Sequence, residues 1–480
     1  MELKQKLTRQ AVMQVYDYLN KDFEGNLPKV VQIVEKMAPK EYSSRVEMVK
    51  RAIIDEGEDN NWYRLVRSIW FDIDPGVRDR AFVNFFIRGN FDWAITKKKI
   101  EEREGIRLPW TILIDPTTAC NLKCTGCWAA SYGHSKNLSY EELSGIIRQG
   151  KELGMHVYLF SGGEPMVRKA DIIKLCEQYP DCEFGAFTNG TLIDEQFAND
   201  MLRVQNFIPI ISVEGFEKAT DSRRGEGVFR YVVKAMKLLR EKKLPFGVSC
   251  CYTSANVDSI SSEEYFDWMV DSGAKFAWFF TYMPVGKDAT KDLLASAEDR
   301  KKMYDAIRKF RNEKAIFTID FWNDGEFTNG CIAGGKHYLH INAAGDVEPC
   351  AFIHYSDSNI RDKLLLDCLK GSLFRHYRAA QPFSDNLLRP CPFLDNPGAL
   401  AKIVDESGAV STDYQEPENI HESAKRTVEV AEAWKKTADE LWAETLQRKP
   451  QLADKNQSKK DVSYLKYIDG ADESGGKIAK

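Results

Sequence analysis

The sequence has 480 residues, of which 43% are hydrophobic and 29% charged, and a net charge of −5, values typical of a globular protein with a large core. This charge balance gives no sign of general nucleic-acid binding, so no nucleic-acid partner is expected. The longest apolar runs, such as residues 274–280, are shorter than the roughly 18 residues of a membrane span. Because no signal-peptide pattern opens the chain, we expect a cytoplasmic protein.

Residues 1–105 are predicted to be helical. Segments 27–39 and 41–54 place apolar residues at helical spacing. Residues 60–102 combine many aromatic side chains with arginines and contain three consecutive lysines at 97–99. We interpret this segment as helices that pack against the next domain. A second interpretation is an apolar substrate channel, or a membrane-surface contact, that serves a lipid-like substrate.

Residues 106–315 alternate between short apolar strands and amphipathic helices. Strands are predicted at 111–117, 156–163, 182–190, 207–215, 246–254 and 275–286, each followed by a helix. Six such units in a row predict an α/β fold with a parallel sheet, either a barrel-like arc or an open doubly wound sheet. In a barrel, the chemistry would lie at the carboxyl ends of the strands.

The alternation is predicted to stop after residue 314. Within residues 316–400, the segment 338–350 has the apolar runs and the Gly-containing turn of a hairpin, and a helix is predicted at 364–381. Residues 401–480 are predicted to hold a charged helix at 421–449 and a mobile tail from residue 455.

The chain has eleven cysteines, an odd number that argues against a disulfide framework and favours metal-binding and buried thiols. Cys120, Cys124 and Cys127 follow the first predicted strand on one short loop, so they can surround one metal centre. Three thiolates leave one iron of a cuboidal cluster without a protein ligand, and that iron can bind a substrate or cofactor. A structural zinc site completed by a distant histidine is the alternative.

Small and polar residues end the next three predicted strands. Gly162 and Gly163 let a ligand approach the backbone, and Glu164 can accept a hydrogen bond from an amine. The third and fourth strand ends carry Asn189, Ser212 and Glu214. Each motif taken singly is typical of a plain turn between a strand and a helix, but their repetition at successive strand ends indicates a ligand site.

Together these motifs resemble the radical S-adenosylmethionine (SAM) enzymes, in particular the members with a C-terminal SPASM- or twitch-type auxiliary iron–sulfur region. The resemblance covers about residues 111–395 and implies a partial (β/α)6 TIM-like barrel, with an N-terminal helical region and a small auxiliary-cluster domain. It also implies that a 4Fe–4S cluster on Cys120, Cys124 and Cys127 binds SAM through its open iron. Four regions are therefore expected. Residues 1–105 form an N-terminal helical region and residues 106–315 the SAM-binding barrel. Residues 316–400 form the auxiliary-cluster domain, and residues 401–480 a C-terminal helix and tail.

The resemblance further implies how SAM would be held. Trp128 would flank the cluster and the adenine. The methionine amine would be held by Gly162, Gly163 and Glu164. The other expected contacts are Ser212 and Glu214 near the ribose, Arg224 at the carboxylate, 282–286 at the adenine, and Asn189. One electron passed into the sulfonium would break a C–S bond and give a 5′-deoxyadenosyl radical, and a low-potential reductant of the flavodoxin or ferredoxin type would supply that electron.

A second set of cysteines lies further along the chain. Thirteen residues separate Cys331 from Gly345, and four separate Gly345 from Cys350, which resembles the opening of the auxiliary-cluster domain. Cys391 is the expected third ligand. Because the terminal cysteine run of the full SPASM pattern is missing, one auxiliary 4Fe–4S cluster is predicted rather than two. Its fourth ligand stays open between Cys368, which also fits a buried thiol, an oxygen ligand such as Asp395, and no ligand.

Cys250 and Cys251 occupy adjacent strand positions and therefore point to opposite faces. One could face the barrel interior, where it would donate a hydrogen atom or bind metal; two core residues are the alternative. The residues predicted to be core, packed or surface residues rather than ligands are Cys176, Cys182, His337 and His340.

The sequence therefore predicts a radical SAM enzyme that abstracts a hydrogen atom from carbon of a peptide, protein or lipid-like substrate. Two other classes remain open. An iron–sulfur electron-transfer or scaffold protein without SAM chemistry would not need the ligand cradle at the strand ends. A zinc-stabilised binding protein would be distinguished by its metal content.

Overall fold

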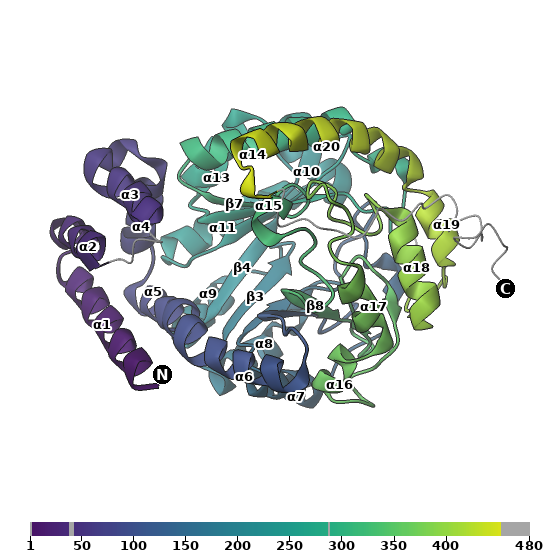
Figure 1. Ribbon diagram of the computed structural model, residues 1–480, viewed down its shortest axis with the longest axis horizontal. Helices are drawn as coiled ribbons and strands as arrows, with labels where there is room; N and C mark the ends of the chain where they lie inside the picture. Colours follow the sequence, from purple (N-terminus) through teal and green to yellow (C-terminus); the bar gives the residue numbers. More distant parts are fainter. Residues whose placement is uncertain (1, 38–42, 287–288, 453–480) are drawn as a thin grey trace.

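The computed structural model describes residues 2–37, 43–286 and 289–452, so the tail predicted from residue 455 lies outside the described residues. One nine-stranded sheet runs through the molecule, in the order β7-β6-β5-β4-β3-β2-β1-β8-β9 (Figure 1). Its first seven strands all pair in parallel with their neighbours in the chain. They are β1 (Thr111–Ile114), β2 (Val157–Phe160), β3 (Glu183–Thr188), β4 (Phe207–Ser212), β5 (Gly247–Tyr252), β6 (Phe276–Thr281) and β7 (Phe317–Asp320). The predicted parallel α/β sheet is confirmed.

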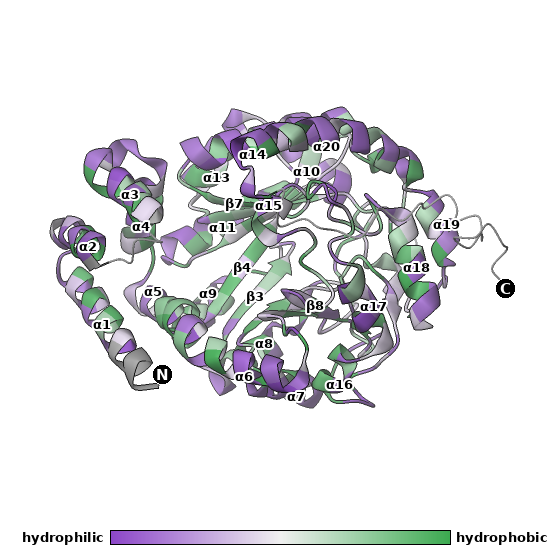
Figure 2. Ribbon diagram, viewed as in Figure 1, coloured by the Kyte–Doolittle hydropathy of each residue, from purple (hydrophilic) through white to green (hydrophobic). Residues whose placement is uncertain are grey.

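A helix follows each of the first six strands, as the alternating pattern predicts. The principal ones are α7 (Tyr140–Glu152), α8 (Lys169–Gln178), α9 (Glu195–Val204), α11 (Val228–Glu241), α13 (Glu263–Ser272) and α14 (Ala297–Glu313), with the shorter α10 (Glu217–Arg224) and α12 (Val257–Ile260) between them. Helix α7 begins with a capping box, in which Ser139 and Glu142 each accept a hydrogen bond from the other's backbone N–H. Figure 2 shows the apolar strands inside and polar outer helix faces, the distribution expected when helices cover a sheet.

The alternation does not stop at residue 314, because β7 pairs in parallel with β6. The predicted hairpin at 338–350 is confirmed as β8 (Tyr338–Ile341) and β9 (Val347–Glu348), which pair antiparallel. Strand β8 also pairs in parallel with β1, with Thr111 opposite Tyr338. Segment 316–400 therefore contributes strands to both ends of the sheet that holds the β–α units.

The remaining C-terminal elements surround this part of the sheet. They are α15 (Gly325–Thr328), β10 (Tyr355–Ser356), α16 (Leu365–Leu369), α17 (Ser372–Ala380), α18 (Pro397–Ser407), β11 (Val410–Ser411), α19 (Ile420–Lys425) and α20 (Val428–Arg448). Helix α20 lies along α14 (Figure 1). Its fully buried Trp434 donates a hydrogen bond of 2.9 Å from Nε1 to the Leu388 carbonyl. This contact ties the C-terminal helix to the rest of the fold.

The N-terminal region is helical throughout its described residues. It consists of α1 (Glu2–Lys21), α2 (Phe23–Met37), α3 (Ser43–Lys50), α4 (Asn61–Asp72), α5 (Pro75–Ala81) and α6 (Ala94–Glu104), with π-helical segments at Arg51–Asp55 and Phe82–Trp93 and a 3₁₀ turn at Gly57–Asp59. Asn84 donates a hydrogen bond of 2.9 Å to Glu183 at the start of β3, and Trp93 stacks on His156 just before β2, with ring centroids 4.2 Å apart. The region therefore packs at the amino-terminal ends of the strands.

Candidate functional site

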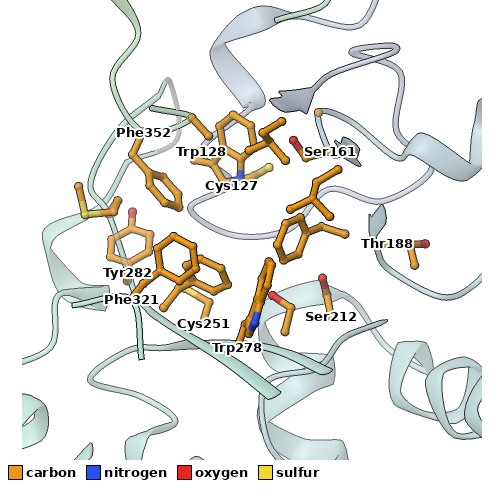
Figure 3. Close-up of a pocket in the computed structure, with 18 of the residues that line it drawn as sticks. Cys127, Trp128, Ser161, Thr188, Ser212, Cys251, Trp278, Tyr282, Phe321 and Phe352 are labelled. Carbon is orange, nitrogen blue, oxygen red and sulfur yellow. The ribbon is translucent and has the colours of Figure 1, made fainter. Parts of the chain in front are cut away.

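A cavity of about 380 Å³ runs along the strands, and its lining includes the loops at their carboxyl ends as well as Trp110, Thr111 and His337 at the amino-terminal ends of β1 and β8. Side chains from strands β1 to β7 and from the loops that follow them line it (Figure 3). Of the predicted SAM-binding residues, it is lined by Cys120, Cys124, Cys127, Trp128, Gly162, Gly163, Glu164, Asn189, Ser212 and Arg224. The structure thus brings together residues that are as much as 104 positions apart in the chain.

The three-cysteine loop joins β1 to α7, and its thiols are not in disulfides. Burial raises the pKa of Cys120 to about 11 and also raises the pKa of Cys127. Such thiols keep their protons until a metal ion replaces them. Within the described ranges, no three His, Cys, Asp or Glu side chains converge closely enough to hold a single ion. A cuboidal cluster needs no such convergence, because each thiolate binds a different iron.

Gly162 and Gly163 let the end of β2 touch the backbone that leads into the cysteine loop. The Gly163 N–H donates to the Thr117 carbonyl over 3.0 Å, and the Glu164 N–H donates to the Ala119 carbonyl over 2.8 Å. Gly162 has a φ of +98°, and a Cβ built on Gly163 would lie 2.2 Å from the Ala119 oxygen. Any other side chain at residue 163 would push apart the two segments that form this side of the cavity.

Glu164 connects the ends of β2 and β3. Its carboxylate is buried and accepts hydrogen bonds from Thr188 Oγ1 at 2.6 Å, from the Asn189 N–H at 2.7 Å and from the Met166 N–H at 3.0 Å. Burial raises the pKa of Glu164 above its usual value, and the three donors offset only part of this effect. Only one of the donors reaches Oε2, so this oxygen keeps capacity for another donor from the cavity.

Glu214 is not among the cavity-lining residues. It is fully buried and binds two arginines, accepting from Arg223 Nη1 at 2.7 Å and from Arg224 Nη2 at 2.5 Å. Both arginines line the cavity. Glu214 therefore orients the guanidinium groups of Arg223 and Arg224 and does not itself face the cavity. Arg223 was not among the predicted residues, although it directly precedes the predicted Arg224 in the sequence.

A wall of apolar side chains forms the rest of the cavity. It includes Leu113, Leu159, Phe187, Trp278, Phe280, Ile319, Phe321 and Phe352, several of which point toward one another in Figure 3. No lining residue comes from 60–102, a segment that the structure describes completely. The interpretation of this segment as a substrate channel is wrong, because none of its residues lines the cavity, and the packing interpretation is confirmed by its contacts with Glu183 and His156.

The two adjacent cysteines of β5 point to opposite faces, as predicted. Cys251 lines the cavity, whereas Cys250 faces the outer layer, with its sulfur 3.3 Å from the Tyr265 hydroxyl. His337, predicted to be a packed or surface residue, also lines the cavity, and burial lowers its pKa to about 4. Cys176 and Cys182 are buried in the core, as predicted.

Behind Trp128 lies a buried histidine between two carboxylates. His340 Nδ1 is 2.6 Å from Glu348 Oε2, and its Nε2 is 3.0 Å from Asp115 Oδ1. The Trp128 ring meets the His340 ring edge-on, at 5.8 Å between centroids. Burial lowers the pKa of His340, but Asp115 and Glu348 outweigh it and raise the pKa to about 10. His340 is thus a buried cation that fixes the ring beside Cys127.

This cation predicts how stability depends on pH. Because the pKa of His340 rises from 6.5 to about 10 on folding, its stabilising contribution is complete below pH 6.5 and is lost as the pH approaches 10. We expect the melting temperature of the wild type to fall over this range more steeply than that of His340→Gln, which cannot titrate. Thermal denaturation at one-unit pH intervals measures the difference, and parallel curves would contradict the assignment.

The second set of cysteines also comes together. Cys331, Cys350 and Cys391 line one small cavity of about 40 Å³, which shares Met283, Phe321, Ile332, Tyr338 and Phe352 with the large one. Neither predicted fourth ligand lines it. Cys368 is packed in the main core, and Asp395 accepts a hydrogen bond of 2.7 Å from Arg300 Nη1 and one of 3.0 Å from the Cys391 N–H.

Comparison with known proteins agrees with this geometry. Residues 114–269 match the profile of the Radical SAM superfamily. The AdoMet-dependent heme synthase of Nitratidesulfovibrio vulgaris is 24% identical over 311 residues, 58% of this chain and 83% of the relative. The cysteine-type anaerobic sulfatase-maturating enzyme of Clostridium perfringens is 28% identical over 243 residues, 46% of this chain and 62% of the relative.

Among solved structures, native anSMEcpe with bound AdoMet and a peptide has a TM-score of 0.50 and 18% identity, and the match covers 72% of this chain and 99% of that one. This similarity concerns the fold. Among the described residues, no helix is long and apolar enough to cross a membrane. Radical SAM domains bind a 4Fe–4S cluster and SAM, the cofactors for which three cysteines at an open cavity are suited. Residues 114–269 are therefore similar to the radical SAM domain, and the relatives of this chain include a maturating enzyme.

Proposed function

We propose that this protein is an enzyme that cleaves SAM reductively and abstracts a hydrogen atom from carbon of its substrate. Cys120, Cys124 and Cys127 would hold the 4Fe–4S cluster, and an external flavodoxin- or ferredoxin-type protein would reduce it. The observation that carries the proposal is the single cavity in which three thiols, a buried carboxylate and two arginines meet. An electron carrier or scaffold protein would need the thiols but not the other groups.

The residues of the cavity have separate tasks. When bound, the cluster and SAM supply the electron transfer and the 5′-deoxyadenosyl radical. Glu164 Oε2 would accept a hydrogen bond from the methionine amine, and Arg223 or Arg224 would pair with the carboxylate. Ser212 and Asn189 supply polar contacts on the neighbouring strand ends, and the wall that includes Trp278 and Phe280 excludes water from a reactive radical.

A second cluster would occupy the small cavity at Cys331, Cys350 and Cys391. Its support is that these three cysteines, which are 60 positions apart at the extremes, line one cavity. No Cys, His, Asp or Glu besides these three lines that cavity in the described part of the chain, so we propose a cluster with three cysteine ligands.

The substrate is proposed to be a peptide or protein, with an apolar group entering the large cavity. The Clostridium perfringens relative is named for the maturation of a protein, which favours this class. The apolar wall favours an uncharged reacting group, because burying an unpaired charge there would be costly. A lipid-like substrate is the second candidate, since the same wall would also bind an acyl chain.

The test uses anaerobically prepared, dithionite-reduced protein with SAM and either deuterated peptide or deuterated lipid fractions. Deuterium in 5′-deoxyadenosine from the peptide fraction alone supports the proposal, and label from lipid alone favours the second candidate. Cys124→Ala is the control. If the wild type forms no more 5′-deoxyadenosine than this variant, the proposed SAM chemistry is wrong.

A further inference from the structure

We propose that Trp322, Tyr338 and Tyr377 form a shell of hydrogen-bond donors that raises the reduction potential of the second cluster and fits it to accept electrons. These three residues are called the donor shell below. The inference rests on the second cluster of the proposed function. It concerns the small cavity, whose lining includes all three residues and the three cysteines.

Two of the donors are within hydrogen-bond distance of cysteine sulfurs. The Tyr338 hydroxyl is 2.8 Å from Cys350 Sγ, and the Tyr377 hydroxyl is 3.4 Å from Cys331 Sγ. In each pair either atom can donate while the cysteine is protonated. A cysteine that binds metal has lost its proton and can only accept, so both tyrosines must then donate to sulfur.

Trp322 is the third donor, and its Nε1–H is left without a hydrogen-bond partner among the described residues. Its side chain is 5% exposed and lines the small cavity. A buried N–H without an acceptor is unfavourable, which is a reason to expect an acceptor in the cavity. The sulfides and thiolates of an iron–sulfur cluster are acceptors of this kind.

Two backbone groups add to the shell. The Leu394 N–H donates to Cys391 Sγ over 3.3 Å, and the Ala333 N–H donates to Cys331 Sγ over 3.5 Å. With these two, each of the three sulfurs has at least one donor.

Such donors change the potential in one direction. An electron added to the cluster increases the negative charge on its sulfur atoms, so each donor stabilises the reduced form more than the oxidised form. The donor shell therefore favours an electron acceptor. The donor shell also adjoins the large cavity, because Tyr338 lines both cavities.

The test isolates the second cluster in a protein whose Cys120, Cys124 and Cys127 are all alanine. Potentiometric titration, followed by electron paramagnetic resonance, then gives its midpoint potential. We expect Tyr338→Phe, Tyr377→Phe and Trp322→Phe each to shift the potential to more negative values. The matched control is Tyr355→Phe, whose hydroxyl donates to the Glu418 carbonyl over 2.8 Å instead of to sulfur. Unchanged potentials in all three variants would overturn the proposal.

A second measurement needs no variant of the donor shell. Electron–nuclear double resonance of the reduced second cluster, in H₂O and in D₂O, detects exchangeable protons that hydrogen-bond to sulfur. We expect such protons, and their absence would overturn the proposal. If the triple alanine protein binds no iron, the second cluster and the donor shell are both wrong. SAM cleavage by the wild type would still stand, so the two failures are distinguishable.

Discussion

Replacing Cys120, Cys124 and Cys127 together with alanine is expected to halve the iron content and abolish formation of 5′-deoxyadenosine. The reason is that the two adjoining cavities have no cysteine in common, so the loss of one set of thiolates leaves the other intact. Iron and sulfide analysis of anaerobically reconstituted protein, with chromatographic assay of 5′-deoxyadenosine, measures both effects.

The matched control for this variant is Cys368→Ala. Cys368 is a fully buried thiol of the core that lines neither cavity, so its removal should leave the iron content unchanged. A fall in iron in the control would make Cys368 a ligand. Zinc in place of iron in the wild type, or equal iron in wild type and triple variant, would contradict the proposal of two clusters.

The sequence predicted the sheet because each β–α unit is local. Apolar strands of four to six residues followed by amphipathic helices form the β1–α7 to β6–α14 series, and the pattern that predicts them lies within each unit. The pairing of β8 with β1 was not predictable in this way, because it joins residues that are 227 positions apart in the chain, such as Thr111 and Tyr338. The hairpin pattern at 338–350 predicts β9 as a partner but does not indicate β1.

The candidate site was predictable to the extent that it follows strand ends. Cys120, Gly163 and Asn189 come together because parallel strands place their carboxyl ends at one edge. The hydrogen-bond partners were not predictable. Glu164 and Glu214 are both carboxylates at strand ends, but only Glu164 lines the cavity, since the guanidiniums of Arg223 and Arg224 cover Glu214.

The segment 60–102 shows a different limit. Its aromatic side chains predict packing, but composition does not say against which end of the strands the segment packs, and Phe71, Phe85 and Phe86 stay exposed. Contacts such as Asn84 with Glu183, and Trp93 with His156, settle that question in favour of the amino-terminal ends of the strands.

Gly163→Ala is expected to reduce SAM cleavage by about 100-fold, the cost typical of a displacement of about 1 Å at a reacting centre. The added Cβ would lie 2.2 Å from the Ala119 oxygen, and Ala119 directly precedes Cys120, so the alanine can be accommodated only if the cysteine loop moves. The small cavity is lined by other residues, and the second cluster should therefore persist. Measuring 5′-deoxyadenosine formation together with iron content separates a displaced loop from an unfolded protein.

The chain offers a matched control in Gly145→Ala. Gly145 lies within α7, and a Cβ there would have no heavy atom within 4 Å. Alanine in a helix interior is about 1 kcal/mol more favourable than glycine, so this variant should be slightly more stable and fully active. Equal activity of Gly163→Ala and Gly145→Ala would show that the close contact between residue 163 and the cysteine loop does not position the site.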